Sequence, residues 1–186
     1  MARRILYLVS EDWYFVSHRL PMARAALRAG FEVHVATKVA KHGDAIEREG
    51  FILQPRDRRR GSCNPGSLLR AVREVRRIYR QLTPDLVHHV ALMPSIVGSL
   101  AALGLPIICL NALAGLGFAF TTHTAKAVAM RTAIKPMLRG LLNRKRAFVL
   151  VQNPDDRTAM LALGISADKI ALIPGSGVDV EALPAL

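Results

Sequence analysis

The chain has 186 residues, 51% of them hydrophobic and 22% charged, a composition that excludes disordered, collagen-like and fibrous proteins. Its 26 lysines and arginines against 14 acidic residues give a formal net charge of +12. Such a surface favours a polyanionic partner: nucleic acid, anionic lipid or a phosphorylated substrate. The two cysteines, Cys63 and Cys109, are too few for a disulfide framework, so a reducing cytoplasm is expected.

Short apolar runs alternate with segments that have the apolar spacing of helices. Strands are predicted over residues 5–9, 31–36, 51–53, 86–89, 106–110, 147–151 and 170–173. Helices are predicted over residues 17–29, 38–49, 67–82, 93–103, 124–146 and 154–163. Strand–helix–strand units in series form parallel sheets with right-handed crossovers. The sequence therefore predicts an α/β fold, a Rossmann-like parallel sheet of about seven strands with helices on both faces.

One stretch without charged residues, 90–125, is long enough to span a bilayer, which takes about 20 residues. Six glycines and prolines divide it into short pieces, and serine, threonine, asparagine and histidine add polar groups. We therefore interpret it as buried helix, strand and loop. The apolar run at residues 5–9 is too short for a signal peptide and fits a strand.

Ligands of open parallel sheets bind beyond the carboxyl ends of the strands. The loop after the first predicted strand has no glycine-rich dinucleotide fingerprint. It holds Glu11 and Asp12, three consecutive aromatic residues, and the pair His18 and Arg19 at a predicted helix start. A helix N-terminus favours anions and arginine can hold a phosphate with two hydrogen bonds, so this pair is a candidate anion site. Capping or solvation of the helix is the alternative.

Two histidines, His88 and His89, end the fourth predicted strand. Because successive strand residues point to opposite faces, only one of them can face a shared site. The functional interpretation is an imidazole that binds a hydroxyl or phosphate, or transfers a proton. The alternative is one structural and one surface histidine. Neither has a metal partner at a recognisable spacing, so no metal site is predicted.

Small residues follow the fifth and seventh predicted strands. They include Asn111, Gly115 and Gly117 after the fifth strand and Gly175, Ser176 and Gly177 after the seventh. Glycines let the backbone approach a ligand closely, and successive backbone N–H groups can form an anion-binding nest. Tight turns explain both segments equally well.

Two predicted helices carry basic residues beside apolar positions. The residues that would face a membrane are Arg70, Arg73 and Arg77 in the first helix and Lys126, Arg131, Lys135 and Arg139 in the second. Basic amphipathic helices bind anionic bilayers, with about 1 kcal/mol for each basic residue near the surface. An ordinary solvated helix face is the alternative. Nucleic acid is the less favoured partner, because no aromatic residues interleave with the arginines to form a stacking platform.

Four segments together resemble the N-terminal domain of family 4 glycosyltransferases, retaining enzymes with two facing Rossmann-like domains (the GT-B fold). Residues 17–23, SHRLPMA, resemble the first-helix signature of a bacterial subgroup that acts in surface-polysaccharide and lipid-linked glycan assembly. Residues 84–88, PDLVH, are similar to a strand motif of the family. Residues 111–117 resemble the glycine loop of the subgroup, and residues 173–179, IPGSGVD, resemble the exit into the second domain.

The resemblance implies an acceptor-binding domain over residues 1–179, with residues 180–186 beginning a linker to a C-terminal donor-binding domain. The complete enzyme would transfer a sugar from a nucleotide-sugar donor to a lipid-diphosphate-linked acceptor, at the cytoplasmic face of the bacterial plasma membrane. His18 and Arg19 are expected at acceptor phosphate or hydroxyl groups and His88 near the reacting centre; the other acceptor-binding candidates are His89, Asn111, Gly115 and Gly117. The candidates for the cleft or the donor-side loop are Glu11, Asp12, Gly175, Ser176 and Gly177. This chain alone is expected to hold no cofactor and to be inactive.

Two departures from the family pattern limit what the resemblance implies. Many members have a second histidine two positions after the first, but Val90 stands there and His89 lies between, so that role is not carried over. Residues 11–15 replace the glycine pair that many members have after the first strand. The alternatives are a basic, non-enzymatic module that binds nucleic acid or a partner protein, and a single-domain Rossmann enzyme. The missing dinucleotide fingerprint argues against the latter.

Overall fold

The structure of the chain is a computed structural model that describes residues 2–56, 65–113 and 125–175. Its strands are β1 (Arg4–Glu11), β2 (Glu32–Lys38), β3 (Ile52–Pro55), β4 (Leu86–Val90), β5 (Ile108–Ala112), β6 (Ala147–Val151) and β7 (Ile170–Leu172). Its helices are α1 (Asp12–His18), α2 (Leu20–Arg28), α3 (Gly43–Arg48), α4 (Pro65–Leu82), α5 (Leu92–Ala101), α7 (Ala125–Leu142) and α8 (Pro154–Ala162), and Ala167–Lys169 form a short 3-10 helix.

All seven strands form one parallel sheet in the order β3-β2-β1-β4-β5-β6-β7, which confirms the predicted Rossmann-like fold. The chain builds outward from β1 to β3 and then crosses back to place β4 on the other side of β1. This reversal is the point at which open parallel sheets bind ligands, beyond the carboxyl ends of the two central strands. Tyr7 of β1 lies in register with His88 of β4 at this point.

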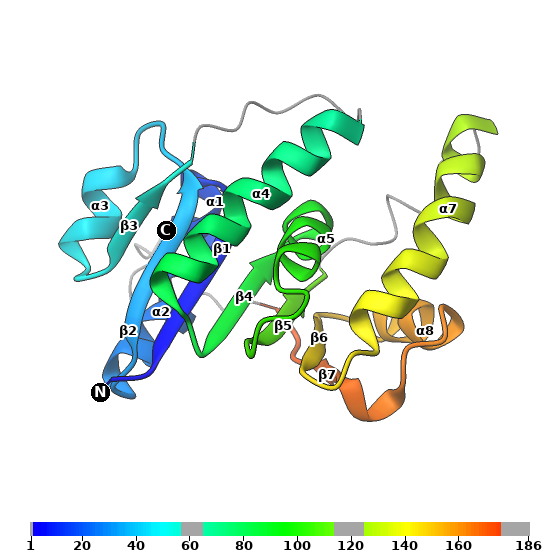
Figure 1. Cartoon of the computed structure of the whole chain (residues 1–186). Coiled ribbons are helices and arrows are strands. Elements are labelled where there is room, and N and C mark those ends of the chain that lie inside the picture. Colours follow the sequence, from blue (N-terminus) through cyan, green and yellow to red (C-terminus); the bar gives the residue numbers. More distant parts are fainter. Residues whose placement is uncertain (1, 57–64, 114–124, 176–186) are drawn as a thin grey trace, which may run out of the picture.

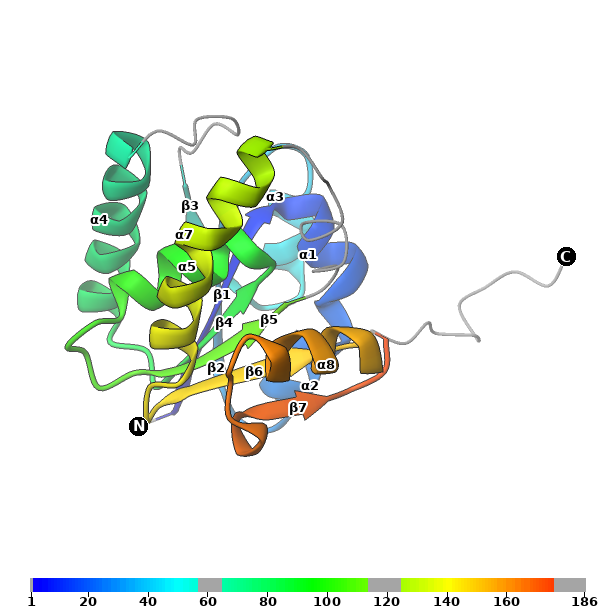
Figure 2. The ribbon, with the colours of Figure 1, turned by 90° about the vertical axis from the view of Figure 1, so that its right-hand side faces the viewer.

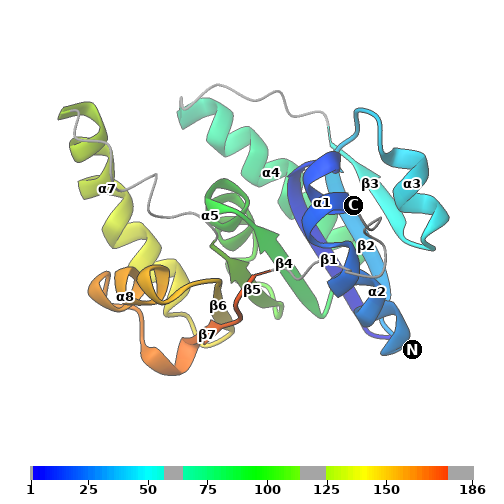
Figure 3. The ribbon, with the colours of Figure 1, turned by 180° about the vertical axis from the view of Figure 1, so that it is seen from behind.

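Helices cover the sheet in two layers, because the crossovers change face where the strand order reverses (Figures 1 and 2). Leu6, Leu8 and Val87 pack in the core beneath α4 and α5, whereas Tyr7, Val33 and Val35 pack beneath α1, α2 and α3. Viewed from behind, α1 and α2 lie over the central strands (Figure 3). A third core joins β6 to α7 and α8. Side chains of β1 alternate in direction although residues 5–9 are all buried, and Tyr7 therefore faces the α1 and α2 layer.

The first crossover differs from its prediction. The segment predicted as a loop followed by a helix over residues 17–29 forms two helices, with α1 beginning at Asp12 and ending at His18. Phe15 is fully buried and anchors α1 to the sheet, which the three consecutive aromatic residues alone did not indicate. Pro21 stands in the first turn of α2, where its missing N–H costs nothing. The break therefore falls at Arg19, between the two helices.

Two other helices are shorter than predicted, and one continues through a proline. Helix α3 covers only residues 43–48 of the predicted 38–49, because residues 39–42 form a turn bound by Asp12. Helix α7 ends at Leu142 and includes Pro136. The charge-free stretch forms the end of β4, α5 and β5. Across the described ranges of the chain, no helix combines the length and the hydropathy that a bilayer crossing needs.

Candidate functional site

Arg19 lies at the break between α1 and α2, and its side chain turns into the protein. The residue caps both helices, since its N–H donates to the Phe15 carbonyl and its carbonyl accepts from the Ala23 N–H. Its φ and ψ of −121° and −8° are not helical. Only 1% of the residue is exposed, and it is the largest of the fully buried side chains. The break between the two helices thus places the Arg19 guanidinium in the protein interior instead of in solvent.

Arg19 lies beside two other buried polar side chains with unused hydrogen-bonding capacity, Tyr7 from β1 and His88 from β4. Each of the three residues is at most 1% exposed. The Tyr7 hydroxyl, Nε and Nη2 of Arg19, and Nε2 of His88 have no hydrogen-bond partner among the residues that the structure describes. Tyr7 and His88 stack with their ring centroids 5.1 Å apart. Buried polar groups are normally hydrogen-bonded, so this group, the Arg19 cluster, points to a ligand with acceptor atoms.

The electrostatics of the Arg19 cluster favour an anion. Burial, as the main cause, and the charges of Arg19 and His89 together lower the pKa of His88 to about 3, so the imidazole is neutral at pH 7. Burial also raises the pKa of the Tyr7 phenol, with Arg19 acting in the opposite direction. Desolvation lowers the pKa of Arg19, and Tyr14 and Tyr7 oppose that shift. The cluster therefore holds one cation, no carboxylate of the described residues forms an ion pair with it, and it offers several donors for an oxyanion.

His18, the neighbour of Arg19, stays at the surface. Its ring stacks on Tyr14 with the centroids 4.2 Å apart and the planes 6° apart. Nδ1 of His18 lies 2.6 Å from the hydroxyl of Ser17. Of the predicted pair, His18 is partly exposed and Arg19 is buried. Tyr14 lies next to both, since its ring stacks on His18 and its phenol raises the pKa of Arg19. The pair occupies the predicted place after β1, but in two different environments.

Asp12 was predicted at the cleft, and the structure gives it a structural role instead. Its carboxylate is fully buried and accepts the backbone N–H groups of residues 40–42 and of Trp13, at 2.7–2.9 Å. Burial alone would raise the pKa of Asp12, but these four hydrogen bonds outweigh it and lower the pKa. Three of these bonds hold the turn after β2, and the fourth holds the first turn of α1. Glu11 ends β1 and precedes α1, and it is partly exposed.

His89 and Asn111, both predicted to bind the acceptor, lie instead in the core on the opposite face. His89 is fully buried, and its Nε2 accepts from the Tyr79 hydroxyl at 2.8 Å while its Nδ1 donates to Oδ1 of Asn111 at 2.8 Å. Asn111 also accepts from Ser99 and donates to the Phe148 carbonyl. Burial lowers the pKa of His89 to about 4, which keeps the ring neutral. Each polar side-chain atom of His89 and Asn111 thus has a partner within the core. Alternation along β4 places His89 on the face opposite His88.

Comparison with known proteins identifies the family. Residues 4–153 match the family described as "Glycosyl transferase 4-like". The chain belongs to this family. The match confirms the family resemblance at this level and makes the chain a glycosyltransferase-type domain. No curated protein matches the sequence.

Solved structures share the fold at low sequence identity. A glycosyltransferase from Rickettsia africae ESF-5 is 16% identical with a TM-score of 0.65, covering 93% of this chain and 43% of its own. MurG from Acinetobacter baumannii is 17% identical with a TM-score of 0.60, covering 98% and 48%. A UDP-GlcNAc 2-epimerase from Methanocaldococcus jannaschii is 16% identical with a TM-score of 0.61, covering 94% and 46%. The glycosyl transferase 4-like domain thus spans less than half the length of each.

The remaining predicted residues of the glycosyl transferase 4-like domain are dispersed. Gly175 follows β7 with a φ of +67°, which suits glycine in a turn. Gly115, Gly117, Ser176 and Gly177 lie outside the described residues, as do the side chains of Lys126 and Arg131. Arg70, Arg73 and Arg77 of α4 and Lys135 and Arg139 of α7 are exposed. No group of three or more metal-ligating side chains gathers in the described ranges.

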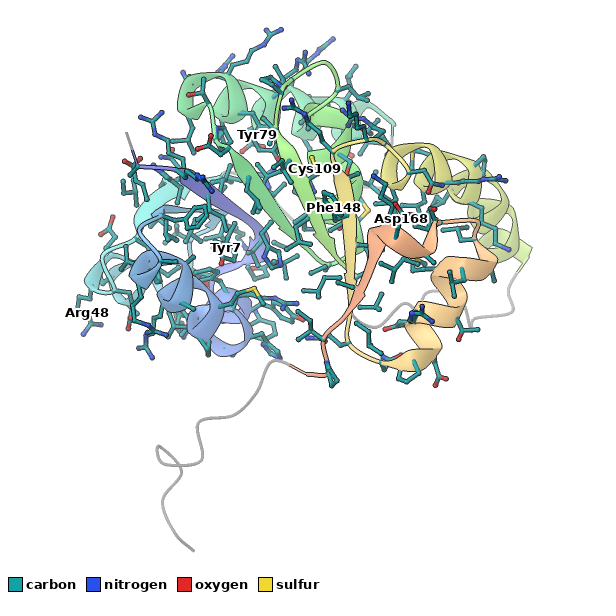
Figure 4. All side chains as sticks on the ribbon, turned by 90° about the horizontal axis from the view of Figure 1, so that it is seen from below. Tyr7, Arg48, Tyr79, Cys109, Phe148 and Asp168 are labelled. Carbon is teal, nitrogen blue, oxygen red and sulfur yellow. The ribbon has the colours of Figure 1, made fainter. Side chains whose placement is uncertain are left out.

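Tyr7 is the site residue that the sequence analysis missed. It stands in a continuous apolar run, and nothing in that run distinguishes a tyrosine that fills the core from one that aims a hydroxyl at a ligand. Figure 4 shows Tyr7 and Tyr79 on opposite sides of the sheet. The hydroxyl of Tyr79 has a partner, His89, whereas that of Tyr7 has none among the described residues. The signal available in the sequence was a tyrosine, with its polar hydroxyl, inside the apolar first strand, next to which the strand order reverses.

Proposed function

We propose that this glycosyl transferase 4-like domain is the acceptor-binding half of a retaining glycosyltransferase of the hexosyl type. The complete enzyme transfers a sugar from a nucleotide-sugar donor to a lipid-diphosphate-linked glycan in cell-envelope polysaccharide synthesis. The Arg19 cluster is the observation that carries this proposal. Buried donors at the sheet's switch point suit a phosphoryl group of the acceptor, and neutral His88 suits a hydrogen bond to it.

A second domain is proposed to hold the donor. The structural neighbours are each more than twice as long as the part that this chain matches. Within the described residues, the sheet's carboxyl edge offers one anion-binding cluster, and a transfer reaction needs sites for both donor and acceptor. We therefore propose that the 186-residue chain binds an acceptor but does not transfer sugar by itself.

A binding and turnover experiment tests this proposal. The chain is titrated with a water-soluble, short-chain prenyl diphosphate N-acetylglucosamine by calorimetry, and then incubated with the same compound and UDP-sugars. The expected result is saturable binding of the prenyl diphosphate compound and no transferred sugar. Sugar transfer by the chain alone would contradict the proposal that a second domain holds the donor. Binding of UDP-sugars with no binding of the prenyl diphosphate compound would contradict the acceptor role.

We also propose that the domain docks on the anionic inner face of the plasma membrane. Arg70, Arg73 and Arg77 lie three and four residues apart on the exposed side of α4, next to Leu69, which is 48% exposed. Lys135 and Arg139 are exposed on α7, which covers the same face of the sheet as α4 (Figure 2). Arg76 does not take part, because it donates to the carbonyls of residues 101 and 103. The proposed surface combines basic heads with an apolar side chain.

Sedimentation with vesicles of phosphatidylglycerol and phosphatidylcholine tests the docking. The double variant Arg73→Gln/Arg77→Gln is expected to bind roughly 30-fold more weakly, from about 1 kcal/mol for each basic residue. Arg28→Gln/Arg48→Gln, which removes two exposed arginines from the other face, is the matched control and is expected to change binding by less than about threefold. Equal losses in both variants would contradict docking through α4. Salt-sensitive binding to duplex DNA, without binding to vesicles, would support the alternative of a nucleic-acid module.

A further inference from the structure

The hydroxyl of Ser17 connects a helix carbonyl to the imidazole of His18. Its Oγ lies 2.8 Å from the Trp13 carbonyl oxygen and 2.6 Å from Nδ1 of His18. Serine within a helix commonly donates to the carbonyl four residues earlier, and this is such a bond. Both neighbours are within hydrogen-bond distance, but a hydroxyl has only one hydrogen to donate.

The number of hydrogens decides which ring nitrogen carries the proton when both contacts are hydrogen bonds. The Trp13 carbonyl can only accept, so in that arrangement the one hydrogen of Ser17 points to it. The lone pair of Ser17 then accepts from Nδ1 of His18, which must carry a hydrogen. In a neutral imidazole with a proton on Nδ1, Nε2 is an acceptor. Among the described residues, none donates a hydrogen bond to Nε2 of His18.

Aromatic rings hold the His18 ring and extend the surface around it. Tyr14 stacks on His18 almost in parallel, and Trp13 contacts Tyr14 edge-on with the centroids 5.5 Å apart. Trp13 is 47% exposed, which is a large solvent-facing area for an indole. Tyr14 also lies close enough to Arg19 to affect its pKa. A fixed acceptor atom and an exposed aromatic face therefore adjoin the Arg19 cluster.

We propose that Nε2 of His18 accepts a hydrogen bond from a hydroxyl of a bound saccharide, whose ring packs on Trp13. Sugar rings combine hydroxyl donors with an apolar C–H face, which matches this pairing of acceptor and indole. Ser17 is a positioning residue that presents the lone pair of Nε2 outward by holding the proton on Nδ1. This inference rests on the proposed function and names the part of the acceptor that lies beside its phosphoryl group.

Nitrogen-15 NMR of the 186-residue chain tests the protonation of the ring directly. Long-range proton–nitrogen spectra distinguish the two neutral forms of imidazole, and His18→Gln assigns the signals. The wild type is expected to show His18 protonated on Nδ1, with Ser17→Thr similar and Ser17→Ala shifted toward the form protonated on Nε2. Thr158→Ala is the matched control, because Thr158 makes the same kind of bond to the Pro154 carbonyl, at 3.0 Å in α8. A wild-type ring protonated on Nε2 overturns the proposal.

Fluorescence tests the ligand, since Trp13 is the only tryptophan in the chain. Free N-acetylglucosamine, galactose and mannose are titrated at pH 7.5, without any phosphate group. At least one of them is expected to change the Trp13 emission saturably, with about five- to tenfold weaker binding in Ser17→Ala and His18→Gln. No saturable change with any sugar, or equal affinity in Ser17→Ala, overturns the proposal. If free sugars bind but the prenyl diphosphate compound does not, the proposed function fails and this inference stands.

Discussion

Replacing Arg19 with methionine is expected to stabilise the ligand-free chain while it removes the binding of anions. Arg19 is 1% exposed. In the part of the chain that the structure describes, two of its nitrogens have no hydrogen-bond partner and no carboxylate forms an ion pair with it. Burying such a group is costly, and an apolar side chain of similar length avoids that cost. Urea denaturation of the Arg19→Met variant is expected to show a free energy of unfolding higher by about 1–3 kcal/mol.

The affinity of the Arg19→Met variant for an anionic ligand is expected to fall, although its stability rises. Calorimetry with the short-chain prenyl diphosphate N-acetylglucosamine is expected to show at least about 100-fold weaker binding for Arg19→Met, because the charge-assisted donors are lost. Arg19→Lys keeps the charge but not the planar arrangement of donors, so an intermediate loss is expected. Arg157→Met, at an exposed arginine of α8, is the control for both measurements. An Arg19→Met variant that is less stable and binds normally would show that the guanidinium is structural.

Replacing Gly98 with alanine is expected to cost about 3–5 kcal/mol of stability, a large share of the 5–15 kcal/mol typical of a domain. A Cβ at Gly98 would lie 2.2 Å from Nε2 of His89, the atom that accepts the Tyr79 hydrogen bond. The ring cannot retreat without breaking that bond or its bond to Asn111, so α5 must move away from β4. The buried polar groups would then lose partners as well as packing.

Gly140 provides the matched control for this substitution. It is also a glycine within a helix, α7, but a Cβ there meets nothing within 4 Å. Gly140→Ala is expected to raise the free energy of unfolding by about 0.5–1 kcal/mol, since alanine loses less conformational entropy in a helix. Thermal and urea denaturation of both variants make the comparison. Equal stability of the Gly98→Ala variant and the wild type would contradict the role assigned to the His89 network.

Periodicity predicted most of this fold because the central strands β1, β2 and β4 are buried on both faces, which gives continuous apolar runs, and helical spacing separates them. The apolar run from Ile5 to Val9 indicates the first strand. Gly30 and Gly50, both with a positive φ, mark the points at which helices end. The N-terminal crossover was mispredicted because its break depends on the burial of Phe15 and Arg19. That burial is a tertiary property, and no local pattern reports it.

The candidate site divides in the same way. The sequence indicated the His18–Arg19 pair and showed that only one of His88 and His89 could reach a shared site. It could not decide which one, because alternation fixes relative and not absolute direction. Nor could it recognise Asp12 as a structural carboxylate, since the three N–H groups of the turn that it binds lie 28–30 residues away in the chain.

The sequence by itself determined the α/β class, the alternation of strands and helices that makes the sheet parallel, and the family. These follow from periodicity and local motifs. Only the tertiary structure brought Tyr7, Arg19 and His88 together from two adjacent strands and a helix break. It also assigned His89 and Asn111 to the core. The physical reason is that hydrogen-bond partners and burial are set by the pairing of β1 with β4 and by the layers on each face. Those contacts join residues about 80 positions apart, as in the pairing of Tyr7 with His88.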